Sequence, residues 1–419
     1  MPPDIATIRE QFPALGLSDN GRRRVYLDNP AGTQVPQTVI DAVSGCLRDA
    51  NANLGGPFGS SVAAGEIYEA GHAAMADLLN ADSPNEIVFG PNMTTLTFQL
   101  SRCLGRQLQA GDEIIVTELD HDANVAPWML LAQDHGLVIK KTRLDTASGR
   151  LDYAHFDSLV GNRTKLVCVG HASNLLGTIN DINHVCSKAH QFGALVFVDA
   201  VHSAPHLPVD VQQLGCDFLA CSPYKFFGPH QGVLWGREQL LKDIFSYKLR
   251  PAPDTVPGRF ETGTQSHEAI AGVTAAIDYL AGLAADGGNR RRRLAAAMQG
   301  IHEYETALCG QLLERLEAVD GICIYGITAA GQLHERTPTV SFTLDGIRPA
   351  AIASHLGRNN IFSWSGHSYA VEPCQALGLL ESGGVLRVGL VHYNAADDID
   401  ALVDALGQLV AEQRSKRSA

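Results

Sequence analysis

Residues 194–232, ALVFVDAVHSAPHLPVDVQQLGCDFLACSPYKFFGPHQG, hold the acid and the lysine that decide the fold class. Asp199 ends one apolar run, and Lys225 follows the end of a second one, Phe218–Cys221. Short apolar runs that are bounded by turn residues predict buried strands. We therefore expect both charged side chains at the carboxyl ends of strands that lie close together in the sequence.

Similar runs surround this stretch and alternate with segments of helix length, such as Thr94–Leu108 and Ile182–Phe192. Alternating strands and helices predict an α/β fold with a mainly parallel sheet covered by helices. Sheets of this kind bind ligands at the carboxyl ends of their strands. The seven expected strands are Glu86–Phe89, Glu113–Thr117, Leu137–Lys141, Lys165–Gly170, Leu195–Asp199, Phe218–Cys221 and Gly232–Trp235.

The pattern changes near residues 287–289, where Gly-Gly-Asn precedes a long helical pattern, about Arg290–Val319. Short strands and a final helix follow, which predicts a smaller α+β domain. We divide the chain into an N-terminal segment (1–25), a large domain (26–285) and a small domain (286–419). The later elements expected in the small domain are Ile322–Ile327, Thr337–Thr343, Val385–Leu390 and the helix Ala396–Glu412.

Charge and composition exclude several classes of protein. The formal net charge of −13 argues against a nucleic-acid partner, and the run Arg290–Arg293 is interpreted as a solvated helix face. The first residues, MPPDIATIREQFPAL, do not resemble a signal peptide, and no apolar stretch approaches the about 18 residues that cross a membrane. Nine scattered cysteines without a CxxC pair predict reduced thiols and a cytoplasmic protein.

A buried acid and a buried lysine at successive strand ends are typical of an enzyme that uses pyridoxal phosphate (PLP). A desolvated lysine has a lowered pKa and bonds covalently to the cofactor aldehyde. A buried acid such as Asp199 pairs with the pyridinium nitrogen and keeps it protonated. Each residue alone has a structural alternative: Lys225 as a surface lysine, and Asp199 as a helix N-cap. The two together favour the cofactor.

Other polar residues after strand ends fit the rest of this cofactor. The segment Gly90–Thr95 supplies NH groups and hydroxyls for a phosphate at a helix N-terminus, unless Thr94 or Asn92 merely caps that helix. Ser222 and Tyr224 flank the lysine and complete the phosphate cup. His202 follows Asp199 by three residues and is a candidate donor to the phenolate oxygen, with a satisfied half-buried histidine as the alternative.

His121 also follows a strand, between Asp120 and Asp122. It is expected to stack on the pyridine ring and to relay protons, because its ordinary pKa is near neutrality. A metal site formed by these three residues is the competing hypothesis. Consecutive residues of an extended chain point to opposite faces, which disfavours that site.

An amino-acid substrate needs a clamp for its carboxylate. Arg387, in the strand Val385–Leu390, is the best candidate, because an arginine in a buried strand is costly unless it meets an anion. Asn174 is a second donor or a turn asparagine.

Taken together, these segments resemble the class V aminotransferase superfamily, and within it the cysteine desulfurase/selenocysteine lyase branch. The resemblance covers nearly the whole chain. It is carried by Tyr26–Thr33 (YLDNPAGT), Thr117–Trp128, Ser173–Ile182, Asp199–His202, Ser222–Gly232, Phe260–Thr264 (FETGT) and Leu386–Leu390.

The resemblance implies a fold type I PLP enzyme that works as a homodimer with active sites at the interface. It assigns the covalent cofactor link to Lys225, the pyridine nitrogen to Asp199, the phenolate oxygen to His202 and the ring stack to His121. It implies that Arg387, Asn174, Asn29 and Tyr369 lie at the substrate. The implied phosphate ligands are Thr95, Ser222, Tyr224 and, from the partner subunit, the residue Thr264. Thr94 and Asn174 are also expected to contact the cofactor.

The chain departs from the desulfurase pattern in two places. Desulfurases carry a persulfide-forming cysteine on a mobile loop, where this chain has Tyr369 in Ser365-Gly366-His367-Ser368-Tyr369. The position before the lysine is Tyr224 instead of the usual histidine. Cys374 lies five residues after Tyr369, and free cysteines are most often core residues.

We therefore expect a C–S lyase that eliminates the β-substituent of a small L-amino acid without a persulfide cysteine. The alternatives are an aminotransferase, a desulfurase or selenocysteine lyase that uses Cys374, and a non-catalytic binding protein on the same fold.

Overall fold

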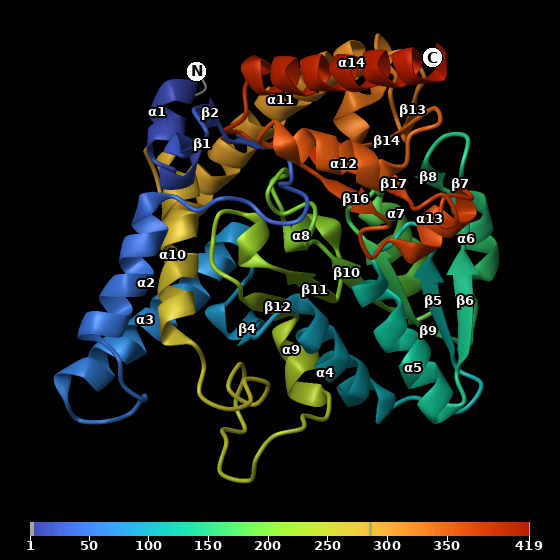
Figure 1. Ribbon diagram of the computed structural model, residues 1–419. Coiled ribbons are helices and arrows are strands. Elements are labelled where there is room, and N and C mark those ends of the chain that lie inside the picture. Colours follow the sequence, from blue (N-terminus) through green and yellow to red (C-terminus); the bar gives the residue numbers. More distant parts are fainter. Residues whose placement is uncertain (1–3, 285–286, 419) are drawn as a thin grey trace.

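The computed structural model describes residues 4–284 and 287–418, and a twisted seven-stranded sheet lies at its centre (Figure 1). The strand order is β4-β12-β11-β10-β9-β5-β6, and only β12 runs antiparallel to its neighbours. All seven strands coincide with the expected runs to within two residues at either end. They are β4 (Ile87–Gly90), β5 (Glu113–Thr117), β6 (Val138–Thr142), β9 (Thr164–Gly170), β10 (Leu195–Asp199), β11 (Phe218–Cys221) and β12 (Gly232–Gly236).

Both faces of the inner strands are buried, which explains why these strands are mainly apolar, whereas the edge strand β6 carries Lys140 and Lys141 and is largely half-buried. Side chains alternate along β10: Val196 and Val198 belong to one core cluster, and Phe197 belongs to another. The second cluster lies under helices α4 (Met93–Gly105) and α5 (Ala126–His135). The first cluster includes residues of the helices α3 (Gly59–Leu79), α7 (Ile182–His190) and α10 (His267–Gly282).

The C-terminal part forms an antiparallel four-stranded sheet of order β13-β14-β17-β16, with its own core. Its strands are β13 (Ile322–Tyr325), β14 (Thr339–Leu344), β17 (Val385–Gly389) and β16 (Trp364–Gly366). Its helices are α11 (Arg290–Glu317), α12 (Pro349–Arg358), α13 (Val371–Ala376) and α14 (Ala396–Ser418). The domain boundary expected at residues 285–286 lies outside the described residues.

The N-terminal residues lie against this C-terminal part. Strand β3 (Val25–Tyr26) pairs in parallel with β15 (Ile361–Phe362). Arg9 and Arg23 both donate to the buried carboxylate of Asp398, with N–O distances of 2.7 and 2.6 Å. The other α-helices and strands are α1 (Ile5–Glu10), β1 (Ser18–Asp19), β2 (Arg22–Arg23), α2 (Gln37–Asp49), β7 (Leu144–Asp145), β8 (Arg150–Leu151), α6 (Tyr153–Leu159), α8 (Val211–Leu214) and α9 (Glu238–Asp243).

The basic run at the start of α11 is not simply a solvated face, so that interpretation is wrong for two of its four arginines. Arg290 pairs with Asp77 at 2.7 Å. Arg291 donates to the carbonyl oxygen of Leu78 at the end of α3 and to the carboxylate of Asp210. These contacts tie the long helix to the large domain. Across the two described ranges, no helix combines the length and the apolar character needed to cross a membrane.

Candidate active site

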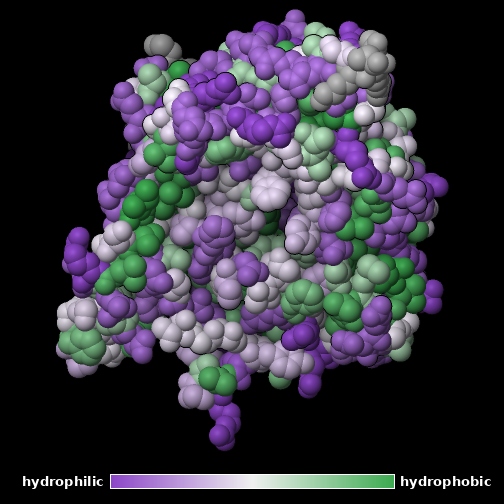
Figure 2. Space-filling model, viewed as in Figure 1, coloured by the Kyte–Doolittle hydropathy of each residue, from purple (hydrophilic) through white to green (hydrophobic). Residues whose placement is uncertain are grey.

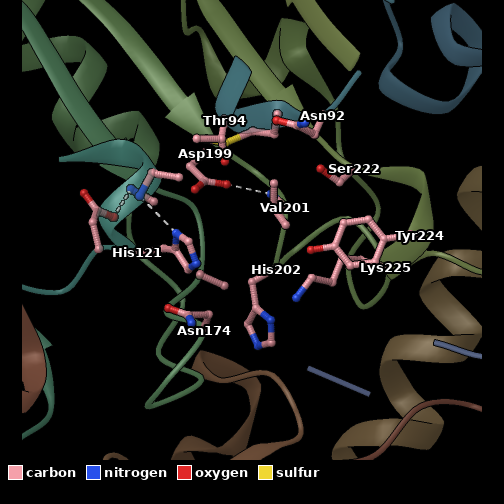
Figure 3. A pocket seen from close by; sticks show the side chains of 15 residues that line it. Asn92, Thr94, His121, Asn174, Asp199, Val201, His202, Ser222, Tyr224 and Lys225 are labelled. Carbon is pink, nitrogen blue, oxygen red and sulfur yellow. Dashed lines mark hydrogen bonds between the residues drawn. The ribbon is translucent and has the colours of Figure 1, made fainter. Parts of the chain in front are cut away.

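A pocket opens beyond the carboxyl ends of the central strands, and its space, open solvent included, is about 580 Å³. Figure 3 shows its labelled side chains around an open centre, with His121 facing Tyr224 and Lys225 across it. The space-filling view is hollowed near the middle of the same face (Figure 2). The lining residues are Asn92, Met93, Thr94, Asp120, His121, Ala123, Gly170, Ala172, Asn174, Asp199, Val201, His202, Ser222, Tyr224 and Lys225.

Lys225 ends a single 3₁₀ turn, Pro223–Lys225, that directly follows β11. Its side chain is buried, and its Nζ donates to the carbonyl oxygen of Pro30, which lies shortly after β3. Burial lowers the pKa of Lys225 to about 7, and the positive Arg387 acts in the same direction, while Asp199 opposes both. The lysine is thus substantially neutral near physiological pH, as an amine that bonds to an aldehyde must be.

Asp199 ends β10, where its neighbours across the ladder are Gly170 of β9 and Ala220 of β11. Its Oδ1 accepts a hydrogen bond from the backbone N–H of Val201 at 2.9 Å. Burial raises the pKa of Asp199 to about 6, against the opposing effects of the Val201 N–H and Lys225. No helix follows Asp199, so the N-cap alternative does not apply. A cationic partner in the pocket would restore its negative charge.

His121 precedes a 3₁₀ turn (Asp122–Asn124), and its Nδ1 accepts from the backbone N–H of Ala123 at 3.0 Å. Nδ1 therefore carries no proton in the neutral ring, and Nε2 carries it. Burial lowers the pKa of His121 to about 4, and Lys225 and Arg387 add to this effect. A neutral imidazole is suited to lie against an aromatic ring.

Asp120 is a buried pocket residue whose role sequence reasoning missed, although it was named as a neighbour of His121. Its Oδ1 accepts from the N–H of Gly170 at 2.5 Å, and its Oδ2 accepts from Asn124. Burial and the nearby Asp199 raise its pKa. These bonds connect the end of β5 to the end of β9 and hold the segment that carries His121. The signal in the sequence was an acid at a strand end directly before the histidine.

His202 lies in the pocket wall, and its Nε2 contacts two hydroxyls of the C-terminal part. The distances are 2.9 Å to Oγ1 of Thr339 and 3.3 Å to Oγ1 of Thr337. Burial holds the pKa of His202 well below its ordinary value, so the ring is neutral. This histidine links the pocket to β14, a contact that its spacing from Asp199 did not reveal.

The N-terminus of α4 forms one wall of the pocket. The side chain of Asn92 caps the helix by accepting from the N–H of Thr95 at 2.8 Å, while Asn92, Thr94 and Ser222 line the space. A Cβ on Gly232 would lie 2.3 Å from the carbonyl carbon of Asn92, so glycine is needed there for this close approach. The free N–H groups of the helix start fit an anion. Thr95 is exposed and does not line the pocket.

Arg387 is buried in β17 and donates from Nη1 to the carbonyl oxygen of Asn174 at 2.8 Å. Its Nε and the Oδ1 of Asn174 are buried but have no hydrogen-bond partner among the described residues. Burial lowers the pKa of Arg387 to about 10, and Tyr224 and Asp28 oppose this shift. A buried cation and an amide oxygen left unpaired fit the carboxylate and the amine of an amino acid.

Four other expected site residues lie differently. The amide nitrogen of Asn29 donates to the carbonyl oxygens of Tyr26 and Gly389, and its oxygen accepts from Tyr393, so its polar atoms are already bound within the protein. Thr264 is exposed in the segment before α10 and is absent from the lining of this pocket. Tyr369 stacks on His121 from outside the lining. Cys374 is fully buried in α13, and burial raises its pKa to about 11.

A metal ion at Asp120, His121 and Asp122 has little support in the contacts of these side chains. The oxygens of Asp120 are used by Gly170 and Asn124, and Nδ1 of His121 is used by Ala123. Among the residues that the structure describes, no group of three or more histidine, cysteine or acidic side chains is arranged to hold a metal.

Comparison with known proteins agrees with this geometry. Residues 25–402 match the family model for class V aminotransferases. A probable cysteine desulfurase of Synechocystis sp. is 33% identical over 97% of this chain and 96% of its own length. A cysteine desulfurase of Yersinia pestis is 34% identical over 97% and 98%, respectively.

Two solved structures share the fold over nearly the full chain. The apo cysteine desulfurase of Thermococcus onnurineus has a TM-score of 0.87 at 27% identity, and covers 98% of this chain and 99% of its own. The cysteine desulfurase CsdA of Escherichia coli has a TM-score of 0.82 at 28% identity, with coverage of 97% and 98%.

Proposed function

This chain belongs to the class V aminotransferase family and is a pyridoxal phosphate enzyme, and from that premise we propose that it is a C–S lyase. Its substrate would be a small L-amino acid with sulfur on the β-carbon. The observation that carries the proposal is the meeting of Lys225 and Asp199 in one buried pocket, combined with a loop that carries no thiol.

The residues present fit the cofactor at each of its ends. Lys225 would hold it covalently, and Asp199 would pair with its pyridine nitrogen. The N–H groups of α4, with Thr94, Ser222 and Tyr224, would hold its phosphate. His202 would contact its phenolate oxygen and His121 would stack on its ring. Thr95 and, from a second copy of the chain, the residue Thr264 remain further candidates for the phosphate.

When bound, the cofactor supplies an electron sink for the negative charge that develops at the substrate α-carbon. Arg387 would bind the substrate carboxylate, and the unpaired Oδ1 of Asn174 would accept from the substrate amine, so that together they fix the direction of the α-hydrogen. The amine of Lys225, neutral because of its lowered pKa, takes the α-proton. Asp199 remains ionised beside the cation that it pairs with. His121 would donate a hydrogen bond from its Nε2–H to the departing sulfur, and the ammonium that Lys225 becomes would give the proton to that sulfur.

The positions of the thiols favour elimination over a desulfurase reaction, which needs a reactive cysteine as the sulfur acceptor. Tyr369 stands at the loop position of the acceptor cysteine and cannot carry a persulfide. Cys374 is buried, and its raised pKa keeps it in the poorly nucleophilic thiol form. A desulfurase or selenocysteine lyase that uses Cys374 is therefore the weaker alternative. An aminotransferase would use the same residues and would differ in that the α-proton is returned to a carbon of the cofactor.

The deciding experiment incubates the cofactor-loaded protein with L-cysteine and identifies the carbon product. Pyruvate, ammonia and free sulfide in equal amounts support elimination. Alanine with protein-bound persulfide would contradict it and restore the desulfurase alternative. Conversion that depends on an added keto acid would indicate an aminotransferase. A Lys225→Ala variant serves as the control, because it should lose both the yellow absorbance of the bound cofactor and the turnover.

We also propose that the enzyme is a cytoplasmic homodimer. Large apolar side chains are exposed on and beside α2 and α3, where Figure 2 shows apolar atoms over α2. Such a surface is typical of a protein–protein contact. The residues are Ile40, Leu47, Leu54, Phe58 and Val62. All nine cysteines lie in the described residues and are free, which fits a reducing compartment.

A further inference from the structure

The loop Gly366–Ala370 adopts a conformation that its sequence does not favour. Ser368 and Tyr369 have φ angles of 51° and 56°, and both are non-glycine residues in the left-handed region. Each such residue costs about 1–2 kcal/mol relative to ordinary helical or extended backbone. Two in succession persist only where surrounding contacts impose them.

Hydrogen bonds from both walls of the pocket impose this conformation. The N–H of Asp122 donates to the carbonyl oxygen of Tyr369 at 2.7 Å. Nδ2 of Asn174 donates to the carbonyl oxygen of Ser368 at 2.9 Å. Within the loop, the N–H of Tyr369 donates to Nδ1 of His367 at 3.0 Å. The loop is thus bound on one side to Asp122, which follows His121 in the sequence, and on the other side to Asn174, which contacts Arg387.

The result of this docking is an aromatic stack. The rings of Tyr369 and His121 have centroids 5.6 Å apart and planes inclined by 27°. His121 lines the pocket while Tyr369 does not, so Tyr369 reaches the imidazole from outside. The tyrosine is 68% exposed, which means that the stack and the bound backbone hold its ring in place, since solvent covers most of it.

We propose that Tyr369 is a positioning residue: its ring holds the imidazole of His121 in place against the cofactor site. The inference rests on the proposed function only in one respect, the role of His121 in the reaction. The strained loop, the bonds to Asp122 and Asn174, and the stack define the role of Tyr369 whatever the reaction is. The aromatic ring, and not the phenol hydroxyl, is the part that acts.

The test measures the reactivity of His121 in the cofactor-free protein, so it does not depend on turnover. Diethyl pyrocarbonate acylates neutral imidazole, and mass spectrometry reports the rate for each histidine. We expect Tyr369→Ala to raise the His121 rate about two- to tenfold, which corresponds to the loss of one aromatic pair. Tyr369→Phe should keep the wild-type rate. The exposed His334 provides the internal reference for reagent activity.

Three results would overturn the proposal. An unchanged His121 rate in Tyr369→Ala would show that the ring does not restrain the imidazole. Equal increases in Tyr369→Ala and Tyr369→Phe would assign the effect to the hydroxyl. An equal increase in Trp364→Ala, which removes another exposed aromatic ring of this segment, would show that the effect is not specific to the stack.

A second readout uses the cofactor-loaded enzyme. Tyr369→Ala should lower kcat about tenfold with KM changed less than twofold, because the carboxylate clamp is untouched, and Tyr369→Phe should restore kcat. A changed KM with constant kcat would contradict positioning. Failure of the proposed function would give a different result. L-cysteine would then yield no pyruvate in any variant, while the acylation rate of His121 would still differ between Tyr369→Ala and Tyr369→Phe.

Discussion

Lys225 and Asp199 lie in one pocket with their ordinary pKa values displaced toward each other, because both are removed from water. The sequence predicts their placement well, since each follows an apolar strand. It does not predict the size of either shift, which depends on burial by segments far away, including Pro30 and Arg387.

The lowered pKa of Lys225 predicts how the apoprotein takes up its cofactor. Only the neutral amine attacks an aldehyde, so the initial rate should rise with pH through about 7 and level off above it. Below that pH the neutral fraction falls about tenfold per unit. Absorbance stopped-flow with PLP measures the rate, and N-acetyl-lysine treated alike corrects for titration of the cofactor. A midpoint near the ordinary lysine value would mean that the amine is solvated.

Cys374 provides a prediction of no effect. Its thiol is buried, and its raised pKa leaves almost no thiolate at neutral pH. Cys374→Ser should therefore leave kcat/KM with L-cysteine within about twofold, while costing roughly 1–2 kcal/mol of stability for a buried hydroxyl. Loss of activity in a variant that is folded by circular dichroism would identify Cys374 as the acceptor.

The roles of Asn29 and Asp120 could not be predicted from the sequence, because they depend on contacts formed only in the fold. Asn29 lies in a motif of the family and was expected at the substrate, but its amide is bound by Tyr26, Gly389 and Tyr393. Asp120 was considered only as a metal ligand, yet it holds the end of β9. Both assignments depend on which backbone groups come close in the fold. The residues near Asn29 and Asp120 in the sequence do not predict these neighbours.

At the scale of elements, the strands of the central sheet were predicted to within two residues because most of them are covered on both faces and are therefore mainly apolar runs, with the edge strand β6 as the exception. Short strands escaped prediction. β15 and β16 have two and three residues, too few to show a period of two. Both strands nevertheless precede the loop that carries Tyr369, so the position of this loop could hardly be predicted from the sequence.

The base of that loop depends on Gly384. It has a φ of 79°, and a Cβ there would lie 2.3 Å from the carbonyl carbon of Gly366. Gly384→Ala should displace the loop and lower kcat/KM at least about tenfold, because small misplacements of a catalytic group are costly. Gly383→Ala is the matched control: it has a φ of 93° but open space around the Cβ. Equal losses in both variants would assign the effect to backbone strain and not to the loop.

At the scale of the molecule, helix α11 is attached to the large domain by arginine contacts that the composition of the chain does not predict. The arginine run at 290–293 was interpreted as a solvated face, yet Arg290 and Arg291 bind the large domain. A run of like charges predicts exposure only on average, and here acids of α3 and α10 and the carbonyl groups at the end of α3 lie within reach.

These contacts predict unequal effects of neighbouring substitutions. Arg291→Ala removes the donors to the carbonyl oxygen of Leu78 and the ion pair with Asp210, so urea unfolding should show a loss of about 2 kcal/mol. Arg292 is exposed, and Arg292→Ala should change stability by less than about 0.5 kcal/mol. Equal losses in the two variants would mean that charge at the start of α11, and not these bonds, determines its stability.

The contact between Lys225 and Pro30 has a consequence for the order in which a growing chain becomes functional. Pro30 follows β3, and β3 is held by β15, which the ribosome makes more than three hundred residues later. A nascent chain that already contains the lysine, the acid and the whole central sheet still lacks β15, the strand that pairs with β3. Vitamin B6 loading should therefore begin only near the end of translation, and an unfinished chain would not sequester the cofactor.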